Sequence, residues 1–432
     1  MILAITVFLI TYVVIATEKF PRQIVALFGA VILVLLNVFD LKEAFGFVDW
    51  ETIGLLFGMF ILIELLKASG FFGWLAATVA ERLHFHPTYI FLAFPLMAGL
   101  LSAFMDSITV MLFLTALTIR IAKVINIDPV PLIVAEVCAA NTGGTATLVG
   151  NPPNVLLGTL LGFDFNQFLI HSAPIALPAL LVVVGVSYLM NRKMLRAAHA
   201  ELKLAQKIED DPGLHITHPR LLQLGLVGFG VALVLLVGHN ALSSILSVHI
   251  SVAVAALLPA FIVVIVGGKE TRQFPAKVDM DSLLFFIGLF MLVGALDKTG
   301  VIKLLATGVA NFASGNAVLL LMVLHWGSGI ASGVVDNVPM ALAMAFLMKN
   351  LAAMPGSPAL SIMLWSLALG LNIGGNMTPV GASANVVAYS YMERNHIHVG
   401  WGRWIKLAVP PAVCAMLLCS VLLIVKYVIG WY

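Results

Sequence analysis

Residues 141–155 read NTGGTATLVGNPPNV, and residues 372–386 read NIGGNMTPVGASANV. Eight of the fifteen paired positions are identical without a gap. Glycines, prolines and amides disfavour a continuous helix, yet each copy lies inside an apolar segment long enough to cross a bilayer. Unwound backbone survives inside a membrane only where protein or a water-filled cavity satisfies it. Two matching interrupted segments therefore predict the binding site of a membrane transporter.

The composition indicates a polytopic membrane protein. Of the 432 residues, 61% are hydrophobic and 10% are charged, whereas a soluble domain carries about 25% charged residues. The three cysteines form no disulfide framework, and the sequence contains no CxxC, HExxH or GxxxxGK[ST] motif. We therefore expect neither an enzyme nor a cofactor or metal site, and no ability of this chain alone to hydrolyse ATP.

Apolar runs predict the order of the spans in the first half. We expect spans at residues 3–16, 24–39, 52–66 and 171–190, and an interrupted segment at residues 129–163. A polar loop is expected at residues 40–51. Residues 87–122 are too long for one simple span and are polar at their middle, which predicts a helical hairpin that enters and leaves on one side. The longest hydrophilic loop then divides the chain into a first transmembrane repeat (1–190), a cytoplasmic inter-repeat loop (191–219) and a second repeat (220–432).

A second alignment supports the duplication. Residues 48–70 (VDWETIGLLFGMFILIELLKASG) match residues 278–300 (VDMDSLLFFIGLFMLVGALDKTG) at seven positions, with an offset of 230. The same offset pairs Asp106 with Asp336. Five full crossings per half is an odd number, so the second half is expected to be inverted. The predicted fold is an all-α polytopic membrane protein, an inverted-topology repeat of two halves, each with about five transmembrane helices, a re-entrant helical hairpin and one broken helix.

The basic residues test this threading independently. With the N-terminus outside, 18 of the 23 Lys and Arg residues face the cytoplasm, Arg22 in the charged turn 17–23 among them. Only Lys42, Lys298, Lys303, Lys349 and Lys426 fall outside. This bias agrees with the positive-inside rule. It predicts an inner-membrane protein with N- and C-termini in the periplasm, surrounded by the lipid bilayer.

Polar groups at membrane depth are the candidate site residues. An ionisable side chain there costs about 2.5–3.5 kcal/mol on insertion scales. We predict that Asp106 and Asp336, at the hairpin tips, couple transport to protons; the alternative is that they only cap helix N-termini. Glu64 and Glu136 are further candidates for proton coupling, although Glu64 alternatively pairs with Lys67.

The interrupted segments supply groups that could surround a small polar solute. Their amides and hydroxyls are Asn141, Thr145, Thr147, Asn151, Asn154, Asn372, Asn376, Thr378, Ser383 and Asn385. The alternative is that these side chains only satisfy the broken backbone. His171 and His325 are weaker candidates, because a lone histidine is more often an interfacial or hydrogen-bonded core residue. Cys138 is better explained as a small buried hydrophobic residue than as a ligand.

With these motifs the sequence resembles the ion transporter superfamily. The segments GGTATLVGNPPN and GGNMTPVGASANVV, in two inverted halves with hairpins, are most similar to the arsenical pump membrane proteins and the melanocyte P-protein-like permeases. The resemblance implies a proton-driven exporter of arsenite and antimonite, and a possible arsenite-stimulated ATPase subunit as partner. Many relatives carry an acid where this chain has Asn151, so no coupling role is transferred to that position.

Other substrates are weighed against the same residues. Sodium-coupled dicarboxylate carriers of the superfamily have Ser-Asn-Thr at the hairpin tips, where this chain has Asp106-Ser107-Ile108-Thr109 and Asp336-Asn337-Val338-Pro339. Two carboxylates would repel a dianion, and the predicted spans have no Arg or Lys near their middles to hold one. Arsenite is mainly the neutral trihydroxide, which suits carboxylates, amides and carbonyls. A monovalent cation suits the same groups, so a sodium/proton antiporter is the alternative.

Overall fold

The computed structural model describes residues 1–17, 19–198, 214–313 and 315–432, and every regular element in these ranges is a helix. Residues 199–213 of the expected inter-repeat loop lie outside the described residues. The first half contains α1 (Ile2–Ala16), α2 (Arg22–Leu35), α3 (Leu41–Gly46), α4 (Trp50–Ala68), α5 (Phe71–Arg82), α6 (Pro87–Ser102), α7 (Ser107–Val124), α8 (Pro129–Gly144), α9 (Pro152–Leu161), α10 (Phe165–His171) and α11 (Ala173–Ala197).

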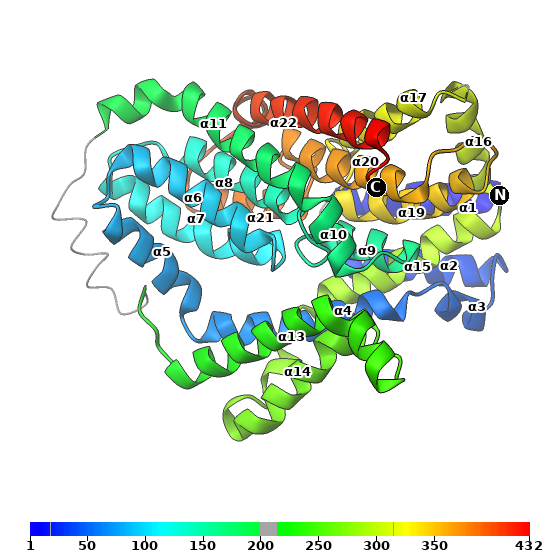
Figure 1. The fold of residues 1–432 in the computed structure, drawn as a ribbon, viewed down its shortest axis with the longest axis horizontal. Coiled ribbons are helices and arrows are strands. Elements are labelled where there is room, and N and C mark those ends of the chain that lie inside the picture. Colours follow the sequence, from blue (N-terminus) through cyan, green and yellow to red (C-terminus); the bar gives the residue numbers. More distant parts are fainter. Residues whose placement is uncertain (18, 199–213, 314) are drawn as a thin grey trace.

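The second half repeats this order. Its elements are α13 (Pro219–Leu246), α14 (Val252–Gly267), the short turns η2 (Gly268–Glu270) and η3 (Phe274–Ala276), α15 (Met280–Lys298), α16 (Val301–Ala313), α17 (Ala317–Met322), the π-helical turn η4 (Val323–Gly327), α18 (Ser328–Ser332), α19 (Asn337–Ala352), α20 (Leu360–Gly374), η5 (Gly375–Met377), α21 (Ser383–Arg394) and α22 (Trp401–Ile429). Long helices such as α11, α13 and α22 lie along the length of the molecule (Figure 1).

The predicted interruptions and hairpins are present. The chain leaves the helix between α8 and α9, and again between η5 and α21. The hairpin expected at 87–122 is formed by α6 and α7, and its counterpart is formed by α17–α18 and α19. By length and composition, seven helices of the described residues can cross a membrane, or eight if α4 and α5, bent by 57°, are counted as one span. Ten crossings were expected; α1, α2 and the pieces of the broken α8–α9 segment are each shorter than a full span.

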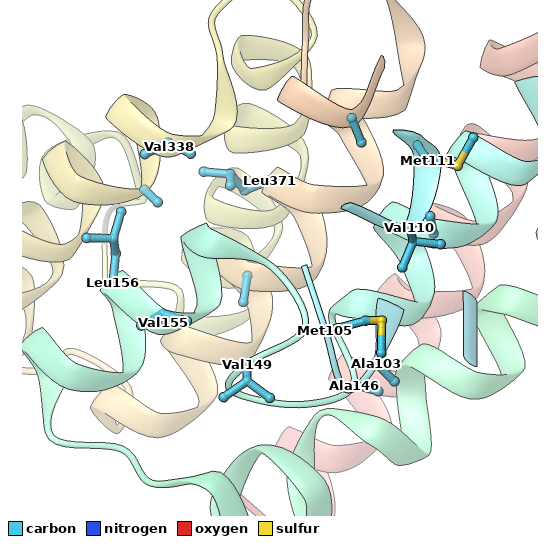
Figure 2. Close-up of a cluster of buried hydrophobic side chains, with 14 of the residues drawn as sticks. Ala103, Met105, Val110, Met111, Ala146, Val149, Val155, Leu156, Val338 and Leu371 are labelled. Atoms are coloured by element: carbon cyan, nitrogen blue, oxygen red, sulfur yellow. The ribbon is translucent and has the colours of Figure 1, made fainter. Parts of the chain in front are cut away.

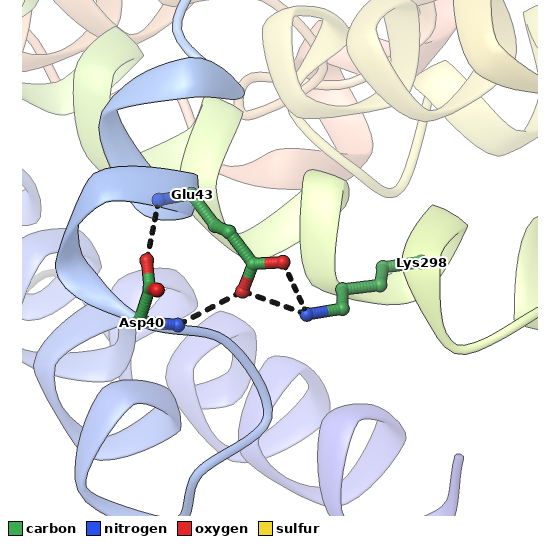
Figure 3. Close-up of polar contacts among 3 residues, drawn as sticks. All are labelled: Asp40, Glu43 and Lys298. Atoms are coloured by element: carbon green, nitrogen blue, oxygen red, sulfur yellow. Dashed lines mark hydrogen bonds and ion pairs between the residues drawn. The ribbon is translucent and has the colours of Figure 1, made fainter.

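The expected polar loop at 40–51 is wrong in its middle, where α3 forms. Asp40 accepts a hydrogen bond from the Glu43 amide at 2.7 Å, and the Glu43 carboxylate accepts one from the Asp40 amide at 3.0 Å. This reciprocal capping box satisfies two free amides and starts a helix. Glu43 also forms an ion pair with Lys298 at 2.8 Å, which fastens α3 to the end of α15 (Figure 3).

The two halves pack against each other with the same exchanged partners. Helix α4 packs against α14, and α15 packs against α2. Because α4 and α15 are repeat counterparts, as are α2 and α14, each half makes the same contact with the other. The second arm of each hairpin likewise packs on the other half's broken helix: α7 on α21 and α19 on α9. Exchanged contacts of this kind are what two inverted repeats related by a pseudo-two-fold axis produce.

Glycines allow the broken helices to approach their own hairpins closely. A Cβ at Gly143 of α8 would overlap the backbone of Gly99 in α6, and a Cβ at Gly374 of α20 would overlap the backbone of Gly329 in α18. The two contacts are repeat counterparts. Small residues are required where membrane helices touch through their backbones. Each hairpin is therefore seated against the interruption of its own half.

Apolar side chains close the space around the interruption. Ala146 and Val149, from the unwound segment, lie beside Ala103 and Met105 of the first hairpin tip (Figure 2). All four are buried. Close packing leaves the unwound backbone in contact with protein, as broken segments at membrane depth require.

Candidate functional site

Six asparagines from the two interrupted segments meet in the centre of the molecule. Asn141 donates to Asn385 at 2.8 Å, and Asn372 donates to Asn154 at 2.9 Å. These bonds are repeat counterparts, because Asn141 corresponds to Asn372 and Asn154 to Asn385. Asn154 and Asn385 each donate onward to two backbone carbonyls of their own unwound loops, at 2.7–3.1 Å. The two broken helices are thus joined by a matched pair of amide bridges.

Two further amides break the symmetry of this network. Asn141 also donates to Asn376 at 2.8 Å, and Asn151 donates to Asn372 at 3.3 Å. The repeat counterparts of Asn376 and Asn151 are Thr145 and an alanine. No side chain of the six is more than 1% exposed. In this structure the amides bind one another and the backbone, so their role in holding a solute stays a prediction.

Threonines of the interrupted segments fasten the hairpin tips. The Thr147 hydroxyl donates to the carbonyl of Ala103, and the Thr378 hydroxyl donates to the carbonyl of Gly333 at 2.5 Å. The bonds again correspond by repeat. Thr145 instead donates to the carbonyl of Thr142 at 2.6 Å, within its own helix end. The threonines therefore join each hairpin to the broken helix of its own half.

Asp106 and Asp336 cap the second arms of the two hairpins, as the alternative interpretation expected. Asp106 accepts from the Thr109 amide at 3.0 Å and from its hydroxyl at 2.7 Å. Asp336 accepts from the Val338 amide at 2.9 Å and from the Ser383 hydroxyl at 3.1 Å. Asp106 is 6% exposed, so it does not face bulk water. Each acid also borders a pocket, and its role in proton coupling stays a prediction.

Asp336 borders a cavity of about 520 Å³. Its polar lining comes from four elements, with Tyr12 from α1, Arg22 from α2, Asp336 from the hairpin tip and Ser383 from α21. Its apolar lining includes Ile108. Of the ten solute-binding residues predicted from sequence, Ser383 is the one in this lining. A cavity of this size and mixed lining is typical of a small-molecule site.

Sequence reasoning missed Arg22 because it lies at the expected charged turn rather than within a span. It is the first residue of α2 and is half-buried. Its guanidinium donates to Ser383 at 3.4 Å and to Ser282 at 3.2 Å, and lies 5.0 Å from the centre of the Phe285 ring. No feature of the local sequence distinguishes it from the other basic residues of the loops, since only tertiary packing brings it to the cavity.

Asp106 borders a second space of about 50 Å³. Glu64 and Asp279 also line it, and Ile108 lines both this space and the larger cavity. Glu64 forms the expected ion pair with Lys67 at 2.9 Å. Asp279 was missed, although it belongs to the repeated Val-Asp pair that precedes α4 and α15. Ile108, in the first turn of α7, therefore lies between the two spaces that the acids border.

Glu136 lies elsewhere. It is fully buried between α8 and α7, where one oxygen accepts from Thr118 at 2.6 Å and the other has no partner. Thr118 is twelve residues beyond Asp106, or about 18 Å along the helix. Glu136 is therefore not part of the tip site, and its coupling role stays a prediction.

The other weak candidates are tied to structure. Both ring nitrogens of His325 lie 3.1 Å from backbone carbonyls, those of Ser366 and Met416. His171 accepts from Lys426 at 2.9 Å. Cys138 is fully buried in α8, as a small hydrophobic residue would be. Within the described ranges, no three His, Cys, Asp or Glu side chains are grouped as metal ligands.

Comparison with known sequences gives matches over almost the whole chain. A family model described as citrate transporter (CitMHS) matches residues 12–370. A 46 kDa membrane protein of Mycobacterium leprae is 33% identical over 99% of each chain. An uncharacterized transporter of Mycobacterium tuberculosis, Rv2684, is 33% identical over 99% of this chain and 98% of its own. The P protein of Mus musculus is 28% identical over 97% of this chain, which spans 60% of that protein.

Solved structures match the fold. The YdaH transporter of Alcanivorax borkumensis superposes with a TM-score of 0.61 at 16% identity, covering 93% of this chain and 89% of its own. MtrF of Neisseria gonorrhoeae, described among antimetabolite efflux pumps, superposes with a TM-score of 0.59 at 14% identity, covering 91% and 83%. At these identities the likeness concerns the fold alone, which is a fold of membrane transporters.

Proposed function

We propose, from the premise that this chain belongs to the citrate transporter (CitMHS) family of membrane transporters, that it exports arsenite or antimonite in exchange for protons. The observation that carries the proposal is the placement of the two acids at the hairpin tips. Asp106 and Asp336, which are repeat counterparts, border neighbouring spaces that share the lining residue Ile108. Paired acids at the centre of an inverted repeat are suited to binding a proton and a solute alternately.

The lining of the larger cavity supports a neutral, hydroxyl-bearing solute. Its charged residues are Asp336 and Arg22, whose charges balance. Carboxylate and serine oxygens can accept hydrogen bonds from a trihydroxide, while guanidinium and serine can donate to it. When a proton binds Asp336, the acid loses its charge and one of its acceptor oxygens becomes a donor, which weakens its hold on the solute. Proton and solute would then compete for the same acid, which is what exchange requires.

Movement between the two sides involves both halves together. The asparagine bridges join the two broken helices, and the threonines join each hairpin to its own broken helix. Moving the hairpin and broken helix of one half alone would break several buried hydrogen bonds, each costing about 1–3 kcal/mol. We therefore expect the two hairpins and two broken helices to move as one body relative to helices such as α4 and α14.

Proton-gradient-driven arsenite uptake into everted vesicles tests the proposal. Asp106→Asn and Asp336→Asn are the variants of choice, because asparagine caps helices about as well as aspartate. We expect each variant to fold and to lose gradient-driven uptake. Full coupled transport by both variants would refute the acid assignment. Purified proteoliposomes without any ATPase then show whether the gradient suffices or the ATPase subunit implied by the resemblance is needed.

A carboxylate such as citrate is a second candidate, favoured by Arg22 and by the description of the family. A guanidinium on an aromatic face is a common carboxylate ligand. It would hold an anion only after Asp336 is neutralised, so proton and anion would move in the same direction. Uptake of labelled citrate that acidifies the vesicle interior, with no arsenite transport, would establish this alternative.

The sodium/proton antiporter remains the rival of the same fold. It predicts that sodium dequenches a pH-sensitive dye in vesicles and that the chain confers no arsenite resistance. Growth of an arsenite-sensitive host on arsenite, and separately on high sodium, separates the two. Placement in the bacterial inner membrane with periplasmic termini is proposed from the distribution of basic residues, and reporter fusions at both ends test it.

A further inference from the structure

Arg22 occupies an unusual place in the site, because it links acids that belong to different elements. Its guanidinium donates to the Ser383 hydroxyl, which donates to Asp336, and to the Ser282 hydroxyl, which donates to Asp279 at 2.5 Å. Each serine accepts from the guanidinium and passes its own hydrogen to a carboxylate. One fixed positive charge therefore lies one hydroxyl away from two negative charges.

The position of this charge is determined by its surroundings. The guanidinium stacks over Phe285 of α15 while its stem leaves the first turn of α2. The bonds to Ser383 and Ser282 use two of the five N–H donors of an arginine, and the residue also lines the cavity. Stacking and two hydroxyl acceptors restrict the rotamers of a side chain that otherwise has about 2 kcal/mol of rotamer entropy. Arg22 is thus held beside the cavity rather than projecting freely into it.

We propose that Arg22 determines the charge of the transported solute: it balances Asp336 inside the cavity, so the site accepts an uncharged solute and excludes monovalent cations. Without Arg22 the cavity would hold an unbalanced carboxylate, together with the hydroxyls of Tyr12 and Ser383. Such a lining binds sodium, which prefers oxygen ligands of net negative charge. The inference rests on the proposed function, since it explains the choice of a neutral solute at the same cavity.

The sequence shows that this balance is specific to one half. Helices α2 and α14 begin 230 residues apart, and Val252 stands where Arg22 stands. Pro152 stands at the repeat position of Ser383. Ser282, in contrast, has a hydroxyl counterpart in Thr52, which donates to Asp49 at 2.7 Å. The cation and the Ser383 hydroxyl are therefore the additions to the repeated frame, which is expected of residues that determine specificity rather than folding.

The experiment compares three variants by ion-specific thermal stabilisation in detergent. Arg22→Met keeps an apolar stem on Phe285 and removes the charge; Arg22→Lys keeps a charge; Arg22→Met with Asp336→Asn restores neutrality. Ligand binding to the folded state raises the melting temperature. We expect sodium, compared with choline, to stabilise Arg22→Met at concentrations at least about tenfold below any effect on the wild type. The lysine variant and the double variant are expected to be as insensitive as the wild type.

Several outcomes would overturn the inference. These are a wild type already stabilised by sodium, an Arg22→Met variant that stays insensitive, or a double variant that keeps the sodium response. If Arg22→Met does not fold, Asp336→Asn gives the mirrored test. In this variant the charge of Arg22 is no longer balanced, so we expect formate to raise its melting temperature and to leave that of the wild type unchanged. If formate does not stabilise Asp336→Asn, the inference is wrong.

Arsenite uptake by the wild type, measured separately, keeps this test apart from the proposed function. Sodium sensitivity gained by Arg22→Met, with no arsenite uptake by the wild type, would sustain the role of Arg22 and reject arsenite as the solute. Arsenite uptake by the wild type with no sodium sensitivity in Arg22→Met would support arsenite as the solute and reject the role of Arg22.

Discussion

The two hairpin tips are repeat counterparts, yet they border different environments. Asp106 faces a space of about 50 Å³ that Glu64 and Asp279 also line. Asp336 faces a cavity ten times larger, about 520 Å³, in which Arg22 lies near it. Both acids cap the second arm of their hairpin, but Asp106 accepts from the Thr109 amide and Asp336 from the Val338 amide, because Pro339 stands where Thr109 stands. Duplication has kept the frame that holds each acid, and divergence has changed what each acid meets.

Under the proposed exchange, this difference separates two tasks. The larger space beside Asp336 has room for a solute and a lining with both donors and acceptors. The smaller space beside Asp106 contains three carboxylates, and a proton bound there relieves contact between like charges. We therefore propose that the solute is contacted at the second tip alone, where a proton competes with it, and that the first tip holds a further proton. Substitutions of matched residues in the frame are expected to have equal effects in the two halves, whereas substitutions of the two acids are not.

The largest effect is expected from the frame, in the matched pair Asn154→Ala and Asn385→Ala. Each substitution removes the side-chain donor to two loop carbonyls and the acceptor of one amide N–H of the other half, whose second N–H keeps its bond. At about 1–3 kcal/mol for each unpaired group, we expect both variants to lose at least about 3 kcal/mol of unfolding free energy. Denaturant titration of the purified protein measures the loss.

Asn395→Ala is the control for this pair, because the Asn395 side chain donates to the Tyr391 carbonyl at an exposed helix end. We expect its unfolding free energy to change by no more than about 0.5 kcal/mol. If Asn154→Ala and Asn385→Ala differ from each other by as much as either differs from the wild type, the two bridges are not mechanically equivalent, and the symmetric frame is wrong.

A smaller effect is expected where the tips differ. In solute counterflow, which needs no proton gradient, Asp336→Asn loses a charge-assisted hydrogen bond to solute. Such bonds contribute about 1.5–3 kcal/mol, so we expect the KM to rise about tenfold or more. Asp106→Asn should leave the counterflow KM within about twofold and lose only the response to an imposed gradient. Equal KM changes in the two variants would remove the division of labour between the tips.

The frame, meaning the two interruptions and the two hairpins, could be predicted from the sequence because local residue chemistry determines it. Glycine and proline disfavour helix at the two interruptions, and the same residues explain the backbone contacts of Gly143 with Gly99 and of Gly374 with Gly329. The hairpin tips followed from an acid at the middle of an overlong apolar run. The capping box of Asp40 and Glu43 was equally readable, since an acid followed three residues later by glutamate signals a helix start.

The site was reached only in part, for a physical reason. Whether a buried amide faces a solute or another amide depends on how two segments 231 residues apart meet, and no local pattern records that. Arg22 illustrates the same limit. Its place in the cavity depends on the packing of α2 on α15 and on the approach of α21. The sequence shows Asp279 as half of a repeated Val-Asp pair, but it does not show that Asp279 lies beside Asp106.

The smallest effect is expected at the Glu43–Lys298 ion pair. This pair has no counterpart in the repeat, because Gln273 and Ala68 stand at the matching positions. Lys298 holds the pKa of Glu43 below its ordinary value of 4.5, helped by the Asp40 amide. Because the folded-state pKa is the lower one, the pair stabilises the protein above pH 4.5, and this is lost as the pH falls through the lowered pKa. Glu43→Gln should therefore melt slightly below the wild type at pH 7, and the gap should close as the pH falls below 4.5. Since both side chains are exposed, 0.5 M salt should narrow the gap at pH 7 as well. Glutamine preserves the capping box, so a gap that persists at low pH and high salt would mean that the ion pair with Lys298 is not what Glu43 contributes.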